Sequence, residues 1–564
     1  MASSPSSRTR TTLTLVFALV TGLVLGWSGS GPGPAANPLK STRDRLALLY
    51  STQFNFTRDG EPLIHAGVLS GVDEVRFSSD GPLRIVPIGE GATEISVDVA
   101  GTHTVKIEEG RPGTYRHWVV VDRIPYSQVD RRDASVDAWV ERGYLPTTIE
   151  VGGLFAIGSR RFDSRAVLVG VGGYDDRDEA INLAERLTAR YGIETELHSE
   201  ILTFPGGNLV LTGKGLKGKV RQADLLWVAP ASQDQELTLE TSRGDRRYKG
   251  ALVFTADAAG HLSVVNAVPT ETFLKGVVPS EVYASAPIES LKAQAVAARG
   301  TLLSAIGVRH LGDPYLLCSD VHCQMYEGLS RETARTNQAV DETRGVLMLE
   351  PGSAARSAHI ADARYSSSCG GHTEDNDKVW GDLPQSYLRG GQDADSSLGA
   401  SFDHGVTDAN VKDWLGTDVK AWCNTSRYGG AKTFRWTKTV DADTLQAYFD
   451  RHFRVGRITD ARIDKRGVSG RVIKMTFVGD KGTVVLDREL SIRRAFDGLR
   501  SSLFTMTIDR DSQGNPRRFA FVGGGFGHGA GMCQTGAMMM AHAGKSYSDI
   551  LTHYYQGVTL ERLY

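Results

Sequence analysis

Short runs of alternating apolar and polar residues, interrupted by glycine and proline, occupy the chain from about residue 46 to residue 123. Residues 94–99 and 104–107 are two such runs. Alternation with a period of two is typical of half-buried strands, and glycine and proline mark the turns between strands. The pattern therefore predicts small antiparallel β structure, within a β-rich region over residues 40–160.

A different pattern begins near residue 161. The apolar run 165–171 predicts a buried strand, and residues 178–191 carry apolar side chains at helical spacing. A strand followed by a helix predicts a βαβ segment over residues 161–205. A generic βαβ unit does not specify a function. The segment is also similar to half of a SPOR domain, a small module associated with septal peptidoglycan binding.

The pattern becomes clearer after residue 245. Residues 252–254 and 262–266, separated by a turn at Gly260, predict a hairpin. Pro287 suits the first turn of a helix, where its missing N–H costs nothing. The apolar stripe of that helix consists of Leu291, Ala295, Ala298, Leu302 and Ile306. We predict an α+β fold, in which the β-rich N-terminal region precedes a mixed domain over residues 245–564 with a packed helix after Glu281.

Glu281 stands just before this helix, in an apolar setting that includes Val277, Val278 and Val282. Desolvation of this kind raises the pKa of a carboxyl group. A carboxyl group that stays protonated near neutral pH can donate a proton to a substrate. The packed helix gives the rigid support that a catalytic proton donor needs. Glu281 is therefore the candidate general acid.

The first 38 residues have the composition of an export segment. Arg8 and Arg10 precede an uncharged, mostly apolar stretch over residues 11–27, and a segment rich in serine, glycine and proline continues to residue 38. This order is typical of a signal peptide followed by a flexible leader, and an uncleaved N-terminal anchor is the alternative. Both interpretations predict an extracytoplasmic protein that is secreted, periplasmic or associated with the cell envelope. A membrane contact is expected only through such an anchor.

Composition and charge exclude several classes of partner. The 564 residues are 40% hydrophobic, which is enough to bury large cores. The chain has 64 basic and 66 acidic residues, a net charge of -2, so no strong field favours nucleic acid or an anionic membrane. The five cysteines cannot all pair within one chain. They indicate disulfides with one thiol left over, or a metal site.

The first cysteine cluster comprises Cys318, Cys323, His322 and the upstream His310. Two thiolates and two imidazoles are ligands of the number and kind that tetrahedral zinc takes. The gap between the cysteines is wider than in the usual zinc knuckle, and a disulfide between them is an equal alternative in an oxidising compartment. Spacing alone does not decide between the two.

Two further clusters lie downstream. Cys369 and His372 flank a pair of glycines, which fits a thiol nucleophile or, more simply, a structural turn or metal ligand. Residues 523–537 are rich in glycine but lack the lysine of a phosphate-binding loop and the spacing of a dinucleotide motif. His528 and Gln534 in this run instead suit a surface that meets the hydroxyl groups of a sugar.

Together these motifs resemble the SpoIID/LytB family of bacterial cell-wall proteins. The resemblance runs from about residue 248 to the C-terminus. It is carried, in order, by Gly-Val-Val-Pro-Ser-Glu at 276–281, Leu-Lys-Ala-Gln-Ala-Val-Ala-Ala-Arg at 291–299, His-Cys-Gln-Met-Tyr at 322–326, Ser-Ser-Cys-Gly-Gly at 367–371 and Gly-His-Gly-Ala-Gly-Met-Cys-Gln-Thr-Gly-Ala at 527–537. One departure is Gly300-Thr301, where the family often has an aromatic residue or threonine.

The resemblance implies a lytic transglycosylase of peptidoglycan that cleaves glycan strands between N-acetylmuramic acid and N-acetylglucosamine. Glu281 maps onto the catalytic glutamate. It would protonate the glycosidic oxygen and then, as a carboxylate, take the proton of the muramic C6 hydroxyl, which leaves a 1,6-anhydro end. A single acid suits this reaction, unlike the two-carboxylate hydrolases. The residues expected to line the cleft are Gln294, Arg299, Gln324, Tyr326, Ser368, His528 and Gln534; for Arg299, pairing with a neighbouring carboxylate is an alternative.

The resemblance requires no cofactor and allows a structural zinc held by Cys318, Cys323, His322 and His310. It also leaves a non-catalytic alternative, because other relatives are named as enhancers of N-acetylmuramoyl-L-alanine amidases. A cell-wall amidase would then be a partner in addition to the glycan strands. A third hypothesis is a thiol or zinc hydrolase that uses Cys369, His372 or the Cys318/Cys323 pair. Sporulation is not implied, since relatives occur in bacteria that form no spores.

Overall fold

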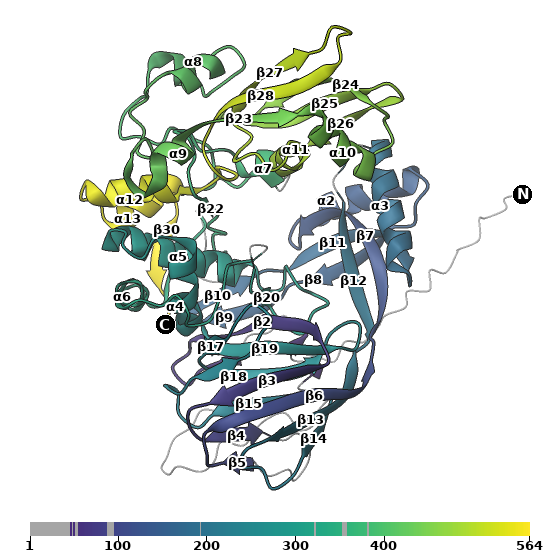
Figure 1. Ribbon diagram of the computed structural model, residues 1–564, viewed down its shortest axis with the longest axis vertical. Coiled ribbons are helices and arrows are strands. Elements are labelled where there is room, and N and C mark those ends of the chain that lie inside the picture. The colour runs from purple at the N-terminus through teal and green to yellow at the C-terminus, as the bar shows by residue number, and fades with distance from the viewer. Residues whose placement is uncertain are drawn as a thin grey trace, which may run out of the picture. The chain divides into compact units, whose positions relative to one another are not determined.

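The computed structural model describes residues 46–47, 49–50, 55–86, 95–191, 193, 195–320, 323–351, 358–380 and 383–564 (Figure 1). The chain divides into two units, residues 1–39 and residues 40–564. The export segment or anchor predicted over residues 1–38 lies outside the described residues. Within the described ranges, no helix combines the length and the apolar character needed to cross a bilayer.

Two large sheets form the β-rich part of the second unit. The first has the order β1-β2-β19-β18-β15-β4-β5, with β20 beside β2, and the second has the order β14-β13-β6-β3-β16-β17. Phe77 of β3 and Phe254 of β18 lie 5.5 Å apart between ring centres and belong to one core. The strands of the first sheet are β1 (Asn55–Phe56), β2 (Pro62–Val72), β4 (Leu83–Val86), β5 (Ile95–Val97), β15 (Leu225–Pro230), β18 (Ala251–Ala256), β19 (Leu262–Pro269) and β20 (Leu317–Cys318). Those of the second are β3 (Glu74–Ser79), β6 (Gly101–Arg111), β13 (Gly206–Gly213), β14 (Val220–Ala223), β16 (Leu237–Leu239) and β17 (Arg246–Tyr248).

The first sheet joins early and late parts of the sequence. The predicted hairpin is confirmed, because β18 and β19 pair antiparallel. β19 also pairs with β2, and β18 also pairs with β15. The sheet therefore contains strands from both sides of residue 245, where the sequence pattern places a domain boundary.

Residues 114–203 contain a four-stranded antiparallel sheet with the order β12-β7-β11-β8. The predicted strand and helix are confirmed as β11 (Ala166–Tyr174) and α3 (Arg177–Tyr191). β7 lies between β11 and β12, so the predicted βαβ segment is one half of a larger βαββαβ unit with ferredoxin-like strand order. Its other elements are β7 (Thr114–Pro125), α2 (Val129–Glu141), β8 (Thr147–Val151) and β12 (Glu196–Thr203), with the hairpin β9 (Leu154–Ile157) and β10 (Arg160–Asp163) inserted after β8.

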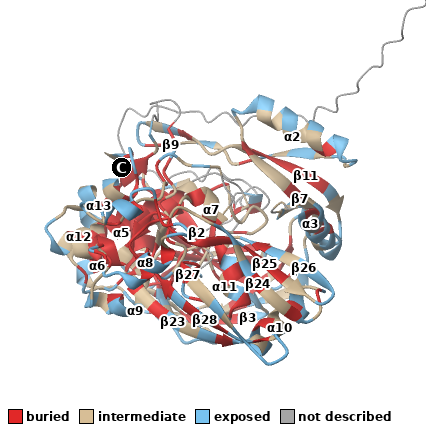
Figure 2. Ribbon diagram, turned by 90° about the horizontal axis from the view of Figure 1, so that it is seen from above, coloured by how far each residue is buried: buried red, intermediate tan, exposed pale blue. Residues whose placement is uncertain are grey.

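Helix α5 (Ile288–Ser304) is the packed helix predicted after Glu281. It is buried on almost every side (Figure 2), by α4 (Thr270–Glu281), α6 (Ala334–Glu342), α12 (Gln534–His542) and α13 (Tyr547–Tyr554). A Cβ atom on Gly300 would lie 2.9 Å from the carbonyl oxygen of Ala361. Glycine therefore lets that segment approach the helix backbone, which explains the departure from the family pattern at this position.

The C-terminal part confirms the α+β class with two three-stranded sheets that share one core. Their elements are β23 (Arg435–Asp441), α10 (Ala442–His452), β24 (Ile458–Arg466), β25 (Val472–Gly479), β26 (Gly482–Asp487), α11 (Glu489–Ala495), β27 (Phe504–Arg510) and β28 (Pro516–Gly524). Two short strand pairs complete the unit: β21 (Val346–Leu349) with β30 (Thr559–Arg562), and β22 (Tyr365–Ser366) with β29 (Met532–Cys533). The shorter helices are α7 (Asn376–Trp380), η1 (Ala400–Phe402), α8 (Val411–Gly416), η2 (Arg427–Gly429) and α9 (Gly430–Phe434). Ser546 and Asp549 form a capping box at the start of α13.

Candidate functional site

Glu281 is the last residue of α4 and is partly buried. Val277 and Val278, about one turn earlier, are fully buried, so the end of the helix is anchored in the core. The backbone N–H of Met325 donates a hydrogen bond to Oε1 of Glu281 at 3.1 Å. Burial raises the pKa of Glu281, and the Met325 hydrogen bond offsets only part of this rise. The carboxyl group is therefore suited to hold a proton.

Three glutamine side chains surround the end of α4. Nε2 of Gln534 donates hydrogen bonds to the backbone oxygen of Glu281 at 3.1 Å and to Oε1 of Gln294 at 3.2 Å. Nε2 of Gln324 donates to the backbone oxygen of Ala298 on α5 at 3.0 Å. Nε2 of Gln294 and Oε1 of Gln324 are buried and have no hydrogen-bond partner among the described residues. Such atoms are costly unless another polar group satisfies them.

Tyr365 is a site residue that the sequence reasoning missed. It lies on β22, which pairs with β29 and so brings the Ser-Ser-Cys-Gly-Gly and Gly-His-Gly motifs side by side. Burial raises the pKa of Tyr365 well above its usual value, and the charge of Glu281 raises it further. The phenol is thus near Glu281 and stays protonated. Its position directly before the Ser-rich motif was the available signal.

His528 holds these two motifs together. Its Nε2–H donates to the backbone oxygen of Tyr365 at 2.8 Å, and its Nδ1 accepts from the backbone N–H of Ala530 at 3.1 Å. Burial, with the nearby charges of Arg364 and Arg471, lowers the pKa of His528 to about 3. The ring is neutral with both nitrogens engaged, so it positions the backbone instead of binding a sugar through a nitrogen.

Arg299 and Tyr326, expected to line the cleft, are instead part of the core. Arg299 is fully buried, and its guanidinium donates to both carboxylate oxygens of Glu271 at 2.9 and 2.6 Å. The hydroxyl of Tyr326 donates to Oδ1 of Asn266 at 2.8 Å, and its ring packs 4.3 Å from that of Phe273. Arg299 therefore has the alternative role predicted for it, pairing with a neighbouring carboxylate. Ser368 is also fully buried, with an Oγ that has no partner in the described part of the chain.

An exposed aromatic surface lies next to Glu281. Tyr283, two residues further on, has 56% of its surface exposed. Its ring centre lies 5.8 Å from that of Tyr428, which in turn stacks on His542 at 5.9 Å. Val282 is extended and ends α4, and the chain then leads to the exposed Tyr283. Two hollows of about 490 and 230 Å³ lie elsewhere, near Arg435 and near Tyr387, and Glu281 lines neither.

The structure brings together three of the four expected zinc ligands. The donor atoms of His310, Cys318 and Cys323 lie within 4.8 Å of one another, and His322 lies outside the described residues. Nδ1 of His310 contacts Oδ2 of Asp313 at 2.7 Å, the outer hydrogen bond that orients metal-binding imidazoles. Two thiols and an imidazole fit zinc. No disulfide joins the five cysteines, all of which are described.

Cys369 and His372 do not form a catalytic dyad. Nδ1 of His372 contacts the backbone oxygen of Thr373 at 2.8 Å, and burial lowers the pKa of the ring to about 4. Burial raises the pKa of the Cys369 thiol, and its Sγ contacts Oδ2 of Asp393 at 3.1 Å. An activated thiol needs the opposite shift and solvent access. This geometry disfavours the thiol-hydrolase hypothesis at Cys369.

Comparisons with known proteins cover most of this region. Residues 258–349 match the SpoIID model, described as stage II sporulation protein, and residues 374–531 match a domain of unknown function, DUF8618. The chain is 28% identical over 301 residues to an amidase enhancer of Bacillus subtilis, across 51% of this chain and 40% of that protein. It is 24% identical to stage II sporulation protein D of the same species, across 52% of this chain and 75% of the relative. An uncharacterised protein of Brachyspira hyodysenteriae is 26% identical across 56% and 72%.

The matched segments coincide with features of the structure. The SpoIID match contains Glu281, Gln294, Gln324 and the cluster of His310, Cys318 and Cys323. The second match covers the two three-stranded sheets and their helices, and it begins after β22 and ends before β29. The chain spans less than half the length of the amidase enhancer that it matches.

Proposed function

This chain belongs to the SpoIID/LytB family, whose members act on the bacterial cell wall, and from that premise we propose that it is a lytic transglycosylase of peptidoglycan. The observation that carries the proposal is the environment of Glu281. Its carboxyl group has a raised pKa and one backbone donor, and no basic group of the described chain is among the causes that shift it. A lone carboxyl group with a raised pKa can act first as an acid and then as a base.

The proposed reaction uses this group twice. Protonated Glu281 donates its proton to the glycosidic oxygen between N-acetylmuramic acid and N-acetylglucosamine, and the bond from that oxygen to the muramic C1 breaks. The Glu281 carboxylate then accepts the proton of the muramic C6 hydroxyl as its oxygen bonds to C1. The carboxyl group is regenerated and a 1,6-anhydro end is formed, with no attacking water.

The surrounding residues support substrate binding. Gln294 and Gln324 offer buried polar atoms without partners among the described residues, and Tyr283 offers an exposed aromatic face. We propose that amide groups bind sugar hydroxyls and that Tyr283 packs on a sugar ring. His310, Cys318 and Cys323 would hold a structural zinc, which when bound would stabilise the segment that presents the Met325 amide to Glu281.

The test is product analysis on glycan strands from which an amidase has removed the stem peptides. We expect the full chain to release fragments with 1,6-anhydro-muramic ends, detected by mass spectrometry. Glu281→Gln should abolish release while it retains glycan binding, because the amide oxygen can still accept the Met325 hydrogen bond but the amide has no acidic proton to transfer. Glu108→Gln, which removes a carboxylate from an exposed ion pair with Arg221, is the matched control and should retain full activity.

A second candidate is favoured by one comparison, since a relative is named an amidase enhancer. In that case the chain binds the wall and stimulates an N-acetylmuramoyl-L-alanine amidase without cutting glycan. Stimulation of amidase activity by both the wild type and Glu281→Gln, with no anhydro product from either, would select this role. Both candidates place the protein outside the cytoplasm.

A further inference from the structure

A second cluster of potential metal ligands lies in the core, distinct from the one at His310. Cys369, Cys423, Cys533 and Asp393 place their donor atoms within 4.8 Å of one another. The three cysteines are fully buried, and Asp393 is 1% exposed. They come from positions up to 164 residues apart in sequence, so the fold has gathered them. The sequence pattern groups Cys369 with His372 and does not indicate this cluster.

The distances suit donors arranged around one ion. Sγ of Cys369 lies 3.5 Å from Sγ of Cys423 and 3.1 Å from Oδ2 of Asp393. A tetrahedral zinc ion with Zn–S bonds of about 2.3 Å separates two thiolates by roughly 3.8 Å. A disulfide would bring two sulfur atoms to about 2.05 Å. The observed sulfur separation is close to that of metal ligands and far from that of a covalent bond.

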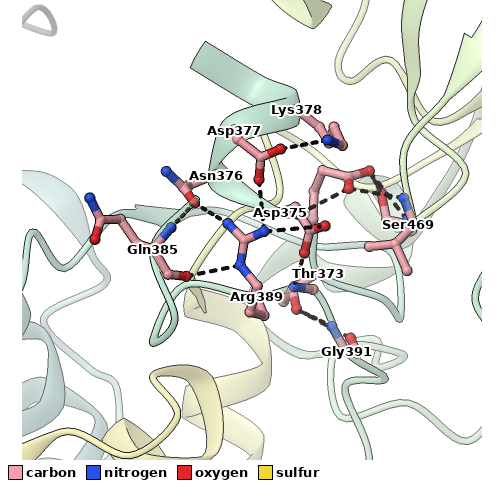
Figure 3. Close-up of polar contacts among 12 residues, drawn as sticks. Thr373, Asp375, Asn376, Asp377, Lys378, Gln385, Arg389, Gly391 and Ser469 are labelled. Atoms are coloured by element: carbon pink, nitrogen blue, oxygen red, sulfur yellow. Dashed lines mark hydrogen bonds and ion pairs between the residues drawn. The ribbon is translucent and has the colours of Figure 1, made fainter. Parts of the chain in front are cut away.

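Hydrogen bonds between neighbouring backbone segments hold two of these residues, Cys369 and Asp393, in place. The backbone N–H of Asp393 donates to the oxygen of Gly371 at 2.9 Å, and that of Thr373 donates to Gly391 at 2.8 Å. The side chain of Thr373 accepts from the N–H of Gly391 at 2.9 Å (Figure 3). This pairing fixes Asp393 beside Cys369.

A hydrogen-bond network around Arg389 holds the loop that joins residues 371–373 to residues 391–393. Its Nε donates to the backbone oxygen of Gln385 at 2.9 Å, and its Nη1 contacts Oδ1 of Asp377 at 2.7 Å (Figure 3). These contacts hold the loop, and its two ends carry Cys369 and Asp393.

The ligands also have outer partners of the kind that support metal sites. Backbone N–H groups of Cys369 and Gly536 donate to Sγ of Cys533 at 3.2 and 3.4 Å, and that of Gly371 donates to Sγ of Cys369 at 3.4 Å. The hydroxyl of Tyr554 donates to Oδ1 of Asp393 at 2.7 Å. Donors aimed at sulfur stabilise thiolates, and a hydroxyl on one carboxylate oxygen orients the other toward a metal.

We propose that Cys369, Cys423, Cys533 and Asp393 bind a structural divalent metal ion, with zinc as the ion that this donor set selects. Three thiolates and one carboxylate favour a soft, tetrahedral ion over magnesium or calcium. The four protein ligands complete the coordination, so the site has no open position for a substrate.

The location of the site gives the ion a role in the fold of the cleft. Cys533 caps the start of α12, and the next residue, Gln534, contacts Glu281 and Gln294. Cys369 follows β22, which carries Tyr365. An ion at this position ties both motifs to the segment around Cys423. The proposal concerns metal binding and does not depend on the reaction proposed for Glu281.

The test is the metal content of the full chain, purified without chelators and measured by inductively coupled plasma mass spectrometry. Cys423→Ser and Asp393→Asn should each contain one equivalent of zinc per chain less than the wild type. The matched control is Cys318→Ser, which disrupts the other cluster and leaves this one intact. Cys318→Ser should retain one equivalent of zinc. Because this variant leaves the buried cluster unchanged, it tests the site even if Cys423→Ser fails to fold.

Three results would overturn the proposal. The first is a Cys318→Ser protein that holds no metal, and the second is a Cys423→Ser protein with the metal content of the wild type. The third is a disulfide among Cys369, Cys423 and Cys533, detected by the intact mass of the denatured, unreduced wild type after alkylation. Cobalt substitution provides a further readout, since thiolate-to-cobalt charge-transfer absorption should persist in Cys318→Ser and weaken in Cys423→Ser.

Discussion

At the scale of single residues, burial raises the pKa of Glu281, and no positively charged neighbour is among the causes that shift it. The pKa of Glu281 is higher in the folded protein than its ordinary value of 4.5. Between these two pKa values, the native state therefore binds more protons than the unfolded state. Stability contributed by this residue therefore falls as pH rises through that range. The same property that suits an acid catalyst costs stability at neutral pH.

This cost predicts that Glu281→Gln is more thermostable than the wild type at pH 7. Below pH 4.5 the two proteins should melt together, because Glu281 is then protonated in both folded and unfolded states. Thermal unfolding followed by circular dichroism at several pH values measures the difference. A difference in Tm that stays constant from pH 4 to pH 8 would show that the carboxyl group is not desolvated.

Tyr283 allows a test of the aromatic surface without disturbing the core, since it is 56% exposed. We expect Tyr283→Ala to weaken binding to glycan strands by about 0.5–1.5 kcal/mol, the energy of one aromatic contact, and to leave Tm within a degree or two. Tyr283→Phe keeps the ring and should bind almost as well as the wild type. Equal binding by the alanine variant, measured by glycan pull-down, would remove Tyr283 from the site.

At the scale of elements, the ion pair of Arg299 and Glu271 connects α5 to α4. Glu271 also accepts hydrogen bonds from the N–H of Gly345 and the hydroxyl of Tyr564. Arg299→Ala would leave this carboxylate buried without its cation, which costs about 3–5 kcal/mol. We expect a large fall in the urea midpoint, whereas activity per folded molecule changes little. Loss of activity at unchanged stability would instead support a role in substrate binding.

The elements also show what the sequence could predict. Local signals correctly gave α3, the β18–β19 hairpin and α5, because each depends on neighbouring residues. The roles of Arg299 and Tyr326 depend on partners 28 and 60 residues away. A motif indicates that a residue matters but does not separate a residue that packs from one that binds. Tyr365 and the Cys423 cluster were missed for the same reason.

At the scale of the whole molecule, the N-terminal strands complete the sheet that supports α4. β2 and β15 flank the β18–β19 hairpin, and the shared core includes Phe77 and Phe254. A chain that starts at residue 245 would lack both flanking strands and would expose the edges of β18 and β19. Unpaired, apolar strand edges favour aggregation.

We therefore predict that residues 245–564 alone do not fold, although this range contains all five family motifs. When it is expressed beside residues 40–564, only the longer chain should be soluble and unfold cooperatively in urea. If residues 245–564 are instead monomeric, with a sharp unfolding transition and glycan binding equal to that of the longer chain, the first sheet is dispensable. Glu281 would then be positioned without the flanking strands, because the fragment retains its hydrogen bonds with the Met325 backbone N–H and the Gln534 side chain.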